Sequence, residues 1–446
     1  MHTLEQLRSG ELAGIQRLSL SCDLENFPEE IFSLADTLEI LDLSGNRLSA
    51  LPDDLPRLHK LRVVFCSNNL FVRVPEVLGQ CAQLSMVGFK ANRIHTVPAK
   101  ALPVALRWLI LTDNQISELP AEIGRCTELQ KLMLAGNQLQ ALPEELASCT
   151  KLELLRISAN RFASLPACIL NLPRLSWLAY AGNPFCIDIE SAVQKNITIT
   201  NINWDELQIQ QQLGEGASGV IHQAVWQGDG SQQVAVKLFK GALTSDGLPD
   251  SEMAACVGAG THPNMIAIHG KIHDHPMGVN GLVMALIDAD FRNLAGPPSL
   301  DSCTRDIYSA DTMFTLDMVL RIALGVASVV RHLHERGLMH GDLYAHNILY
   351  IDAGHALLGD FGAASFLEFA DERHALALKS VEARAFACLL QELLAYCRCD
   401  VGDEVSQAIL LELTELQASC EHDTPSVRPL FLEIEQALQR LRDMQI

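Results

Sequence analysis

Leucine and polar positions follow one recurring pattern through the first 183 residues of the chain. The copy LEILDLSGNRLSALP begins at Leu38, and the pattern returns every 22 or 23 residues. Later copies begin at Leu61, Leu84, Leu106, Leu129, Leu152 and Leu175, and an imperfect first copy begins at Ile15. Leucine at positions one, four and six of a copy can point inward from a short strand, because side chains alternate along a strand. The pattern predicts eight short strands stacked over one continuous core.

Position nine of the repeat is asparagine in seven copies. These residues are Asn46, Asn69, Asn92, Asn114, Asn137, Asn160 and Asn183. An asparagine side chain can bind the turning backbone, whose polar groups need partners. The pattern L-x-x-L-x-L-x-x-N followed by L-P resembles the leucine-rich repeat family. The resemblance implies an α/β leucine-rich-repeat solenoid, a horseshoe, over residues 1–183.

The residues between the inward leucines are expected to face the concave side of the solenoid. At positions three and five, nine of sixteen are large apolar side chains. Exposed apolar surface usually marks an interaction site, and Trp is favoured at binding hot spots. We therefore predict that a protein or peptide binds there, with the chain's own C-terminal domain as one candidate. The predicted binding residues are Phe65, Met86, Trp108, Met133, Leu154 and Trp177. The alternative is that these side chains only pack on one another.

The repeat pattern stops after Pro184, and we expect a linker over residues 184–203. Beyond it, the spacing G-x-G-x-x-G is formed by Gly214, Gly216 and Gly219. A dinucleotide-binding turn shares this spacing but needs a helix directly afterwards. The apolar residues that follow favour a second strand instead, and QVAVKLF at 233–239 predicts another strand, which carries Lys237.

Three further motifs follow in order. LMHGDLYAHNIL at 338–349 contains H-x-D-x-x-x-x-N, D-F-G follows at 360–362, and SVRPLFLEIEQAL spans 426–438. Together with the glycine-rich hairpin and V-A-V-K, this ordered set resembles the protein kinase family over residues 204–446. The resemblance implies a bilobal α+β protein kinase domain.

The resemblance also implies roles for individual residues. Asp342 would orient the attacking hydroxyl and accept its proton, and Lys237 would hold the phosphates of ATP. Glu252, on an expected helix, would pair with Lys237, although Asp250 and Ser251 could simply cap that helix. Asn347 and Asp360 would bind Mg²⁺. The implied ATP-binding residues are Leu213, Gly214, Glu215, Gly216, Gly219, Ile221, Ala235, Lys237, Met284 and Leu286, with Met284 at the gate of the adenine pocket.

Several positions depart from the kinase pattern. Gly341 stands where many kinases carry an Arg that reads a phosphorylated activation loop, and Tyr344 stands where serine/threonine kinases carry Lys. About twenty residues separate D-F-G from a helix expected at 382–394, A-P-E is not recognisable, and Glu382 replaces the usual Asp. The hydroxyl residues of this short segment are Ser365 and Ser380. We therefore predict a kinase that is not switched by loop phosphorylation and is controlled through its repeats.

The sequence thus predicts an ATP- and Mg²⁺-dependent protein kinase, with serine or threonine as the expected acceptor. Its repeats are expected to bind a protein partner or to regulate the kinase domain. Two alternatives stay open, because Gly341, Tyr344 and the short segment are unusual. One is a nucleotide-binding scaffold with little turnover. The other is a small-molecule phosphotransferase, since H-G-D-L also occurs in aminoglycoside kinases.

Charge, hydropathy and cysteine content indicate which partners and which compartment to expect. A formal net charge of −21 disfavours nucleic acid and anionic membranes as partners. No run of about 18 apolar residues predicts a membrane span, and the N-terminus lacks a secretory signal, so we expect a cytoplasmic protein. The 13 cysteines are scattered, without C-x-x-C pairs. Cys81, Cys126 and Cys149 recur at one phase of the repeat and are predicted to be buried apolar side chains rather than metal ligands.

Overall fold

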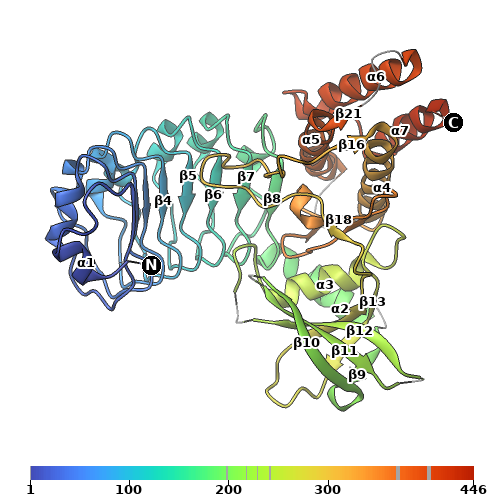
Figure 1. The fold of residues 1–446 in the computed structure, drawn as a ribbon, viewed down its shortest axis with the longest axis horizontal. Coiled ribbons are helices and arrows are strands. Elements are labelled where there is room, and N and C mark those ends of the chain that lie inside the picture. Colours follow the sequence, from blue (N-terminus) through green and yellow to red (C-terminus); the bar gives the residue numbers. More distant parts are fainter. Residues whose placement is uncertain are drawn as a thin grey trace. The chain divides into compact units, whose positions relative to one another are not determined.

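The chain folds as two compact units, Met1–Leu175 and Ser176–Ile446. The computed structural model describes residues 2–196, 199–216, 218–228, 230–240, 243–367, 372–398 and 403–445. Figure 1 shows the strands of the first unit in blue and green and the helices that end the second unit in orange and red. The division lies inside the last copy of the repeat, so the strand of that copy belongs to the second unit.

The first unit is a solenoid of short parallel strands, one for each copy of the repeat. Its strands are β1 (Arg17–Ser19), β2 (Ile40–Asp42), β3 (Val63–Phe65), β4 (Met86–Gly88), β5 (Trp108–Ile110), β6 (Lys131–Met133) and β7 (Leu154–Arg156). Equivalent positions of neighbouring copies are paired, as Ile40 is with Val63. Every strand covers positions three to five, and its central residue, such as Leu41 or Leu132, is fully buried. The predicted strands are confirmed, and burial of these residues stacks the copies.

Short helical turns connect the strands. Helix α1 spans Leu4–Arg8, and the 3-10 turns are η1 (Glu29–Leu34), η2 (Leu55–Arg57), η3 (Glu76–Gln80), η4 (Ala99–Ala101), η5 (Ala121–Arg125), η6 (Glu144–Ser148) and η7 (Ala167–Ile169). The proline of the repeat's L-P pair precedes most of them, as Pro120 precedes η5 and Pro143 precedes η6. Proline is tolerated there because the first donors of a helical turn have no partner within it.

The asparagine at position nine binds the turning backbone, as predicted. In Asn114, Nδ2 donates to the carbonyls of Phe89 at 2.9 Å and Leu111 at 3.1 Å. Its Oδ1 accepts the N–H of Ile94 at 2.9 Å. The other six asparagines also donate from Nδ2 to backbone carbonyls. The residue before the asparagine has a left-handed φ, for example +53° at Ala91, so these bonds hold a turn that most residues adopt only at a cost.

The second unit begins with a strand-rich part. Its elements are β8 (Trp177–Ala179), η8 (Pro184–Cys186), α2 (Ile187–Asn196), β9 (Asn201–Asn203), η9 (Trp204–Glu206), β10 (Leu207–Glu215), β11 (Gly219–Trp226), β12 (Gln232–Phe239), α3 (Pro249–Ala259), β13 (Ile268–His273) and β14 (Gly281–Ala285). Six strands form a sheet in the order β10–β11–β12–β14–β13–β9. Gly219 opens strand β11, which excludes the helix that the dinucleotide-binding alternative requires.

The rest of the second unit is mainly helical. Its elements are β15 (Arg292–Asn293), β16 (Phe314–Thr315), α4 (Leu316–Glu335), β17 (Leu338–Met339), η10 (Ala345–Asn347), β18 (Ile348–Tyr350), β19 (Ala356–Leu358), β20 (Ser365–Phe366), α5 (Glu372–Ala395), β21 (Cys397–Arg398), α6 (Glu404–Glu421), η11 (Pro425–Val427) and α7 (Phe431–Gln445). The two parts together are the expected bilobal α+β architecture. In the described residues, no helix has both the length and the hydropathy needed to cross a membrane.

Helix α5 corrects one boundary of the sequence analysis. The helix expected at 382–394 begins at Glu372, because the residues before Glu382 include several strong helix formers. The segment between D-F-G and this helix is therefore shorter than expected. Residues 368–371 of that segment lie outside the described part of the chain.

The stretch expected as a linker, residues 184–203, contains regular elements and is part of the second unit. Glu190 on α2 accepts the Gly182 N–H at 2.9 Å and the Ser251 hydroxyl at 2.8 Å. Strand β9 pairs in parallel with β13. These contacts attach both elements to the strand-rich part.

The repeat cysteines are buried apolar side chains, as predicted. Cys81, Cys126 and Cys149 are 5%, 1% and 0% exposed. Burial raises the pKa of their thiols to about 11, 11 and 12, so they stay protonated near neutral pH. The sequence has one C-x-C spacing, formed by Cys397 and Cys399, and Cys399 lies outside the described residues.

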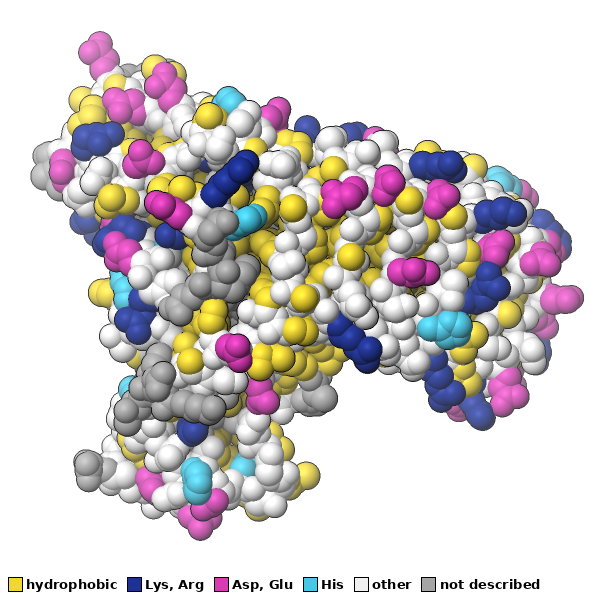
Figure 2. Space-filling view, turned by 180° about the vertical axis from the view of Figure 1, so that it is seen from behind, with side chains coloured by type: hydrophobic (Ala, Val, Ile, Leu, Met, Phe, Trp, Pro, Cys, Tyr) yellow, Lys and Arg dark blue, Asp and Glu magenta, His cyan; other side chains and the backbone are white. Residues whose placement is uncertain are grey.

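The charged side chains are mixed in sign on the face of the molecule that Figure 2 shows. Acidic and basic side chains lie interspersed among each other on this face. The sequence has 54 acidic against 33 basic residues, and the excess is not gathered into one field on this face. Such a surface gives no strong electrostatic steering from this side.

Candidate functional site

A buried ion pair joins the sheet of the strand-rich part to its helix. Lys237 on β12 donates from Nζ to Oε1 of Glu252 on α3, and the two side chains are 13% and 3% exposed. Burial by itself would lower the pKa of the Lys237 ammonium. The carboxylates of Glu252 and Asp360 have a larger, opposite effect, so this pKa is above its ordinary value. The N-cap residue of α3 is Leu248, and it makes no side-chain cap bond, so the structure does not show the helix cap that was the alternative role of this region. The structure brings the predicted pair together.

The three glycines of the hairpin between β10 and β11 have different surroundings. The Gly216 N–H donates to the Gly219 carbonyl at 2.9 Å, which closes the turn. A Cβ added at Gly214 or Gly216 would have no neighbour within 4 Å, so the space beside the turn is open. A Cβ at Gly219 would lie 2.6 Å from the Leu238 carbonyl oxygen, so only glycine fits there. Ala217 lies outside the described residues. Backbone beside open space can approach a phosphate closely.

The other residues predicted to bind ATP lie on neighbouring strands of the same sheet. Ala235 on β12 is directly opposite Met284 on β14, and β11 with Ile221 flanks β12 on the other side. Ala235 is buried, whereas Met284 and Ile221 are half-buried. Leu213 and Glu215 lie at the end of β10, and Leu286 directly follows β14. The sheet thus supplies an apolar wall beside the glycine-rich turn.

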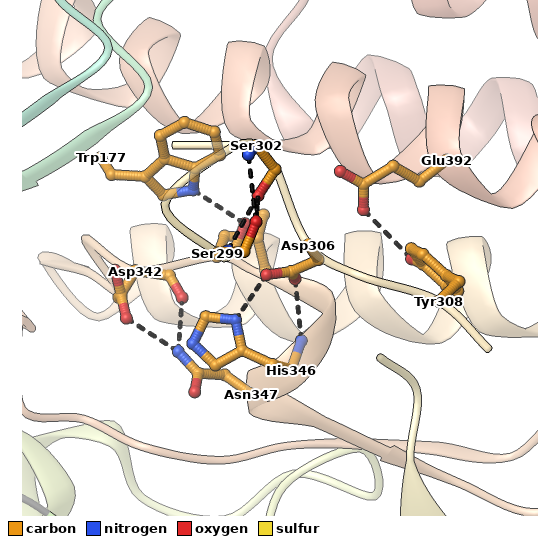
Figure 3. Close-up of polar contacts among 10 residues, drawn as sticks. Trp177, Ser299, Ser302, Asp306, Tyr308, Asp342, His346, Asn347 and Glu392 are labelled. Carbon is orange, nitrogen blue, oxygen red and sulfur yellow. Dashed lines mark hydrogen bonds and ion pairs between the residues drawn. The ribbon is translucent and has the colours of Figure 1, made fainter. Parts of the chain in front are cut away.

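Asp342, the predicted base, and Asn347, a predicted Mg²⁺ ligand, lie together after β17, as Figure 3 shows. The amide nitrogen of Asn347 donates to the carbonyl oxygen of Asp342 at 3.0 Å and to its Oδ2 at 2.8 Å. Both bonds use the nitrogen, so the amide oxygen of Asn347 stays available to a cation. His340 is fully buried, with Nε2 2.8 Å from the Gly359 carbonyl and its ring against Phe361. These contacts fix the loop against D-F-G.

Asp360, the first residue of D-F-G, has a left-handed φ of +52°, and its Oδ1 accepts the Gly362 N–H at 3.1 Å. Its carboxylate contributes to the raised pKa of Lys237, so the two charged groups lie near each other. The Asn347 amide and the Asp360 carboxylate are oxygen ligands of the kind that Mg²⁺ prefers. Among the described residues, no three His, Cys, Asp or Glu side chains form a ready-made metal centre. A magnesium ion would therefore also need phosphate and water oxygens.

A buried carboxylate holds the backbone just before Asp342. The Gly341 N–H donates to Oε1 of Glu382 at 2.8 Å, and Oε2 of Glu382 lies 2.6 Å from Nε2 of His334 on α4. Full burial alone would raise the pKa of Glu382, but His334 and the Gly341 N–H lower it below its ordinary value. Sequence reasoning noted Glu382 only as a substitution and missed His334, because a histidine inside an amphipathic helix carries no motif.

Tyr344 lies in a row of three rings. Trp177 stacks on it with the ring centroids 4.0 Å apart and the planes at 8°, and the centroid of the His346 ring lies 5.0 Å from that of Tyr344. Nδ1 of His346 is 2.7 Å from Oδ1 of Asp306, and the His346 N–H donates to Oδ2 at 3.0 Å (Figure 3). Burial lowers the pKa of His346, but the bond to Asp306 and nearby carboxylates raise it above its ordinary value. Asp306 and His346 were not predicted, because Asp306 lies in a segment without a motif.

The predicted partner-binding residues of the first unit differ in exposure. Met86 and Leu154 are buried, whereas Phe65, Trp108 and Met133 are half-buried. Nε1 of Trp108 donates to Sδ of Met133 at 3.5 Å, and the Lys131 ammonium lies 4.6 Å from the Trp108 ring. The surface thus packs partly on itself and keeps some apolar area accessible. Trp177 belongs to the second unit and is buried against Tyr344.

Three sequence families match parts of the chain. The protein tyrosine and serine/threonine kinase family matches residues 207–385. Two leucine rich repeat families match residues 104–162 and 37–58. Both resemblances drawn from the motifs are thereby confirmed.

Curated relatives share one part or the other. A protein named probable serine/threonine-protein kinase of Dictyostelium discoideum is 29% identical over 170 residues, 38% of this chain and 10% of the relative. An activated Cdc42 kinase-like protein of Drosophila melanogaster is 27% identical over 165 residues, 36% of this chain and 12% of the relative. Leucine-rich repeat and calponin homology domain-containing protein 1 of Mus musculus is 30% identical over 126 residues, 27% of this chain and 18% of the relative. The matches span only a small share of these longer relatives.

Proposed function

We propose that this chain, in which leucine-rich repeats precede a protein kinase domain, is an ATP- and Mg²⁺-dependent kinase that phosphorylates serine or threonine in proteins. The assembled site carries the proposal, because Lys237 is paired with Glu252 while Asn347 is bonded to Asp342. Phosphoryl transfer depends on positioning and charge neutralisation more than on covalent chemistry. The groups that supply both are present together, which argues against a scaffold without turnover.

Each group has a distinct task in this proposal. Lys237, fixed by Glu252, holds the phosphates of the nucleotide. Asp342 is half-buried, so it can orient a hydroxyl and accept its proton. Asn347 and Asp360 hold Mg²⁺, which when bound neutralises the negative charge of the phosphates.

The kinase is proposed to act without loop phosphorylation. Ser365 is fully buried, and its hydroxyl donates to the Ala363 carbonyl at 3.3 Å. Ser380 is 3% exposed, and its hydroxyl donates to the Ala377 carbonyl at 2.7 Å. Residues 368–371, outside the described part, include no Ser, Thr or Tyr. A phosphorylation switch needs an accessible hydroxyl, and buried ones support a site that is assembled without one.

Labelled phosphate transfer from ATP and Mg²⁺ to generic protein acceptors tests the activity. We expect transfer by the native chain and a loss of about 100-fold or more in Asp342→Asn, because a positioned base contributes about that much. Asp311→Asn is the matched control, since Asp311 is an exposed aspartate of the same unit. ATP binding without transfer would refute the proposal in favour of the scaffold. Transfer to aminoglycosides but not to proteins would favour the small-molecule phosphotransferase, and label on tyrosine alone would refute the acceptor assignment.

The repeats are proposed to bind a protein partner through the accessible part of their apolar face. Phe65 and Trp108 are half-buried aromatic residues of the kind that act as binding anchors. The double variant Phe65→Ser with Trp108→Ser should label fewer proteins in an extract of the producing cells, with generic acceptors labelled as before. Val104→Ser, at a residue 71% exposed, should change neither. Equal labelling of the extract by both variants would contradict this role.

A further inference from the structure

We propose that strand β8, the last copy of the repeat, is a positioning element of the catalytic loop, with Trp177 as its principal positioning residue. The inference rests on the proposed kinase activity and names what holds Asp342 in place. It gives the last repeat a task other than partner binding. Three independent contacts of the strand with the loop and with the segment after D-F-G carry it.

The first contact is made by Trp177 and involves both residues that follow Asp342. Nε1 of Trp177 donates to the Leu343 carbonyl at 3.1 Å, a bond drawn in Figure 3. The indole ring stacks nearly parallel on Tyr344, with the centroids 4.0 Å apart. On the loop's flank, the Arg305 guanidinium lies 5.4 Å from the indole centroid. Trp177 and Tyr344 are 1% and 4% exposed, so water does not compete for these contacts.

The second contact comes from Tyr180, directly after β8. Its N–H donates to Oγ of Ser365 at 3.3 Å, and its hydroxyl donates to the Phe366 carbonyl at 3.1 Å. Ser365 and Phe366 form β20, which pairs with β17 just before the catalytic loop. One repeat strand thus contacts the catalytic loop and the segment after D-F-G.

The third contact explains the glycine at position 341. A Cβ there would lie 2.5 Å from the Leu178 carbonyl oxygen of β8 and 2.6 Å from the Ala363 carbonyl oxygen. Gly341 also has a φ of +76°, which disfavours any other residue. Two backbone segments therefore pass where a side chain would start. The close approach of β8 requires glycine at position 341. The Arg that many kinases carry at this position is therefore absent.

The contacts of β8 hold the loop without covering its reacting groups. Asp342 stays half-buried and keeps its bonds from Asn347. The Lys237–Glu252 pair is formed at the same time. An inhibitory strand would cover Asp342 or separate the pair, so the geometry favours a productive arrangement. Tyr344 serves as the platform for Trp177.

The test compares Trp177→Leu, Trp177→Phe and Trp204→Leu in the full chain. Trp204 is a half-buried tryptophan of the same unit whose ring contacts His275 at 4.3 Å, far in sequence from the loop. For Trp177→Leu we expect kcat to fall about 100-fold, as for small misplacements of catalytic groups, with the KM for ATP within about twofold. Trp177→Phe keeps a stacked ring and loses one hydrogen bond, so kcat should recover to within about tenfold of native. Trp204→Leu should leave kcat unchanged.

Amide hydrogen exchange separates this inference from the proposed function. Trp177→Leu should speed exchange at residues 341–345, and Trp204→Leu should not. If the native chain transfers no phosphate, the proposed function fails, and the exchange result alone then decides the contact. Unchanged exchange, or unchanged kcat in an active chain, would overturn the positioning role. So would an equal loss of kcat in Trp204→Leu, since the effect would then be general destabilisation.

Gly341→Ala provides a second route to the same answer. The added Cβ meets two carbonyl oxygens, so this variant should show the kcat loss and the faster exchange of Trp177→Leu. Native kcat and native exchange in Gly341→Ala would overturn the close approach of β8.

Discussion

Replacing Glu382 tests how strongly the catalytic loop is anchored. The carboxylate is fully buried, accepts the Gly341 N–H at 2.8 Å and lies 2.6 Å from Nε2 of His334. A hydrogen bond to a charged group contributes about 1.5–3 kcal/mol, and removing one partner of a buried charged pair costs about 3–5 kcal/mol. We therefore expect Glu382→Ala to destabilise the second unit by about 3–5 kcal/mol. Glu382→Gln keeps an oxygen for Gly341 and places an NH₂ group beside Nε2 of His334, so we expect about 1–2 kcal/mol.

The pH dependence of this difference has a defined sign. Burial by itself would raise the pKa of Glu382. The bonds to His334 and Gly341 lower this pKa by more than burial raises it, so the pKa is below the ordinary 4.5. A carboxyl with a lowered folded-state pKa adds stability above its unfolded pKa and loses it as the pH falls through the folded value. The gap between the native chain and Glu382→Gln should be constant near neutral pH and shrink in acid.

Urea unfolding followed by tryptophan fluorescence measures these free energies. Three of the four tryptophans, Trp177, Trp204 and Trp226, lie in the second unit, and Trp108→Phe as the background removes the fourth. The signal then reports on the second unit alone. If Glu382→Ala loses less than about 1 kcal/mol, or no more than Glu382→Gln, the buried bonds do not anchor the loop as argued.

Three further predictions follow from other contacts. Asn137→Ala removes three bonds to the backbone and should destabilise the first unit by about 3 kcal/mol, measured by Trp108 fluorescence; a loss under about 0.5 kcal/mol would contradict the role of the asparagines. Ser365→Asp puts a charge at a fully buried site, so it should lower the melting temperature and phosphate transfer together, and any activation would argue against loop-independent control. Asp306→Asn should lower the free energy of unfolding most below pH 6.5, the ordinary pKa of His346, because a group with a raised folded-state pKa adds stability that is lost as the pH rises through that pKa. If the unfolding free energies of the native chain and the variant instead diverge toward alkaline pH, this prediction is wrong.

The repeats could be predicted from the sequence because their determinants are local. Each copy contains its own inward leucines, seven of the eight copies contain the asparagine, and each copy forms the expected short strand. The kinase motifs could also be recognised in the sequence, because the fold fixes their order and spacing. The start of α5 was missed because no motif marks it, and helix propensity alone extends it to Glu372.

The remaining parts of the site depend on contacts between distant residues. Asp306 and His346 are 40 residues apart, and Trp177 lies 166 residues from the Leu343 carbonyl that it binds. No sequence motif indicates either pair, because two residues that are bonded across the fold can be any distance apart in the chain. The sequence analysis predicted that Trp177 binds a partner, with the chain's own C-terminal domain as one candidate, and Trp177 stacks on Tyr344. No pattern in the sequence indicated Tyr344 as the residue that it contacts.

Tyr344 and Gly341 looked like two separate losses, and one neighbouring strand accounts for both. Gly341 lets β8 pass, and Tyr344 provides the flat ring on which Trp177 stacks. Restoring the family residue at one position alone should therefore lower activity. Tyr344→Lys removes the stack and places an ammonium beneath the Trp177 ring, where we expect kcat to fall about tenfold or more, since aromatic pairs contribute about 0.5–1.5 kcal/mol and the loop loses its platform. A rise in kcat would mean that Tyr344 is a lost catalytic lysine after all, and that the contact with β8 is incidental.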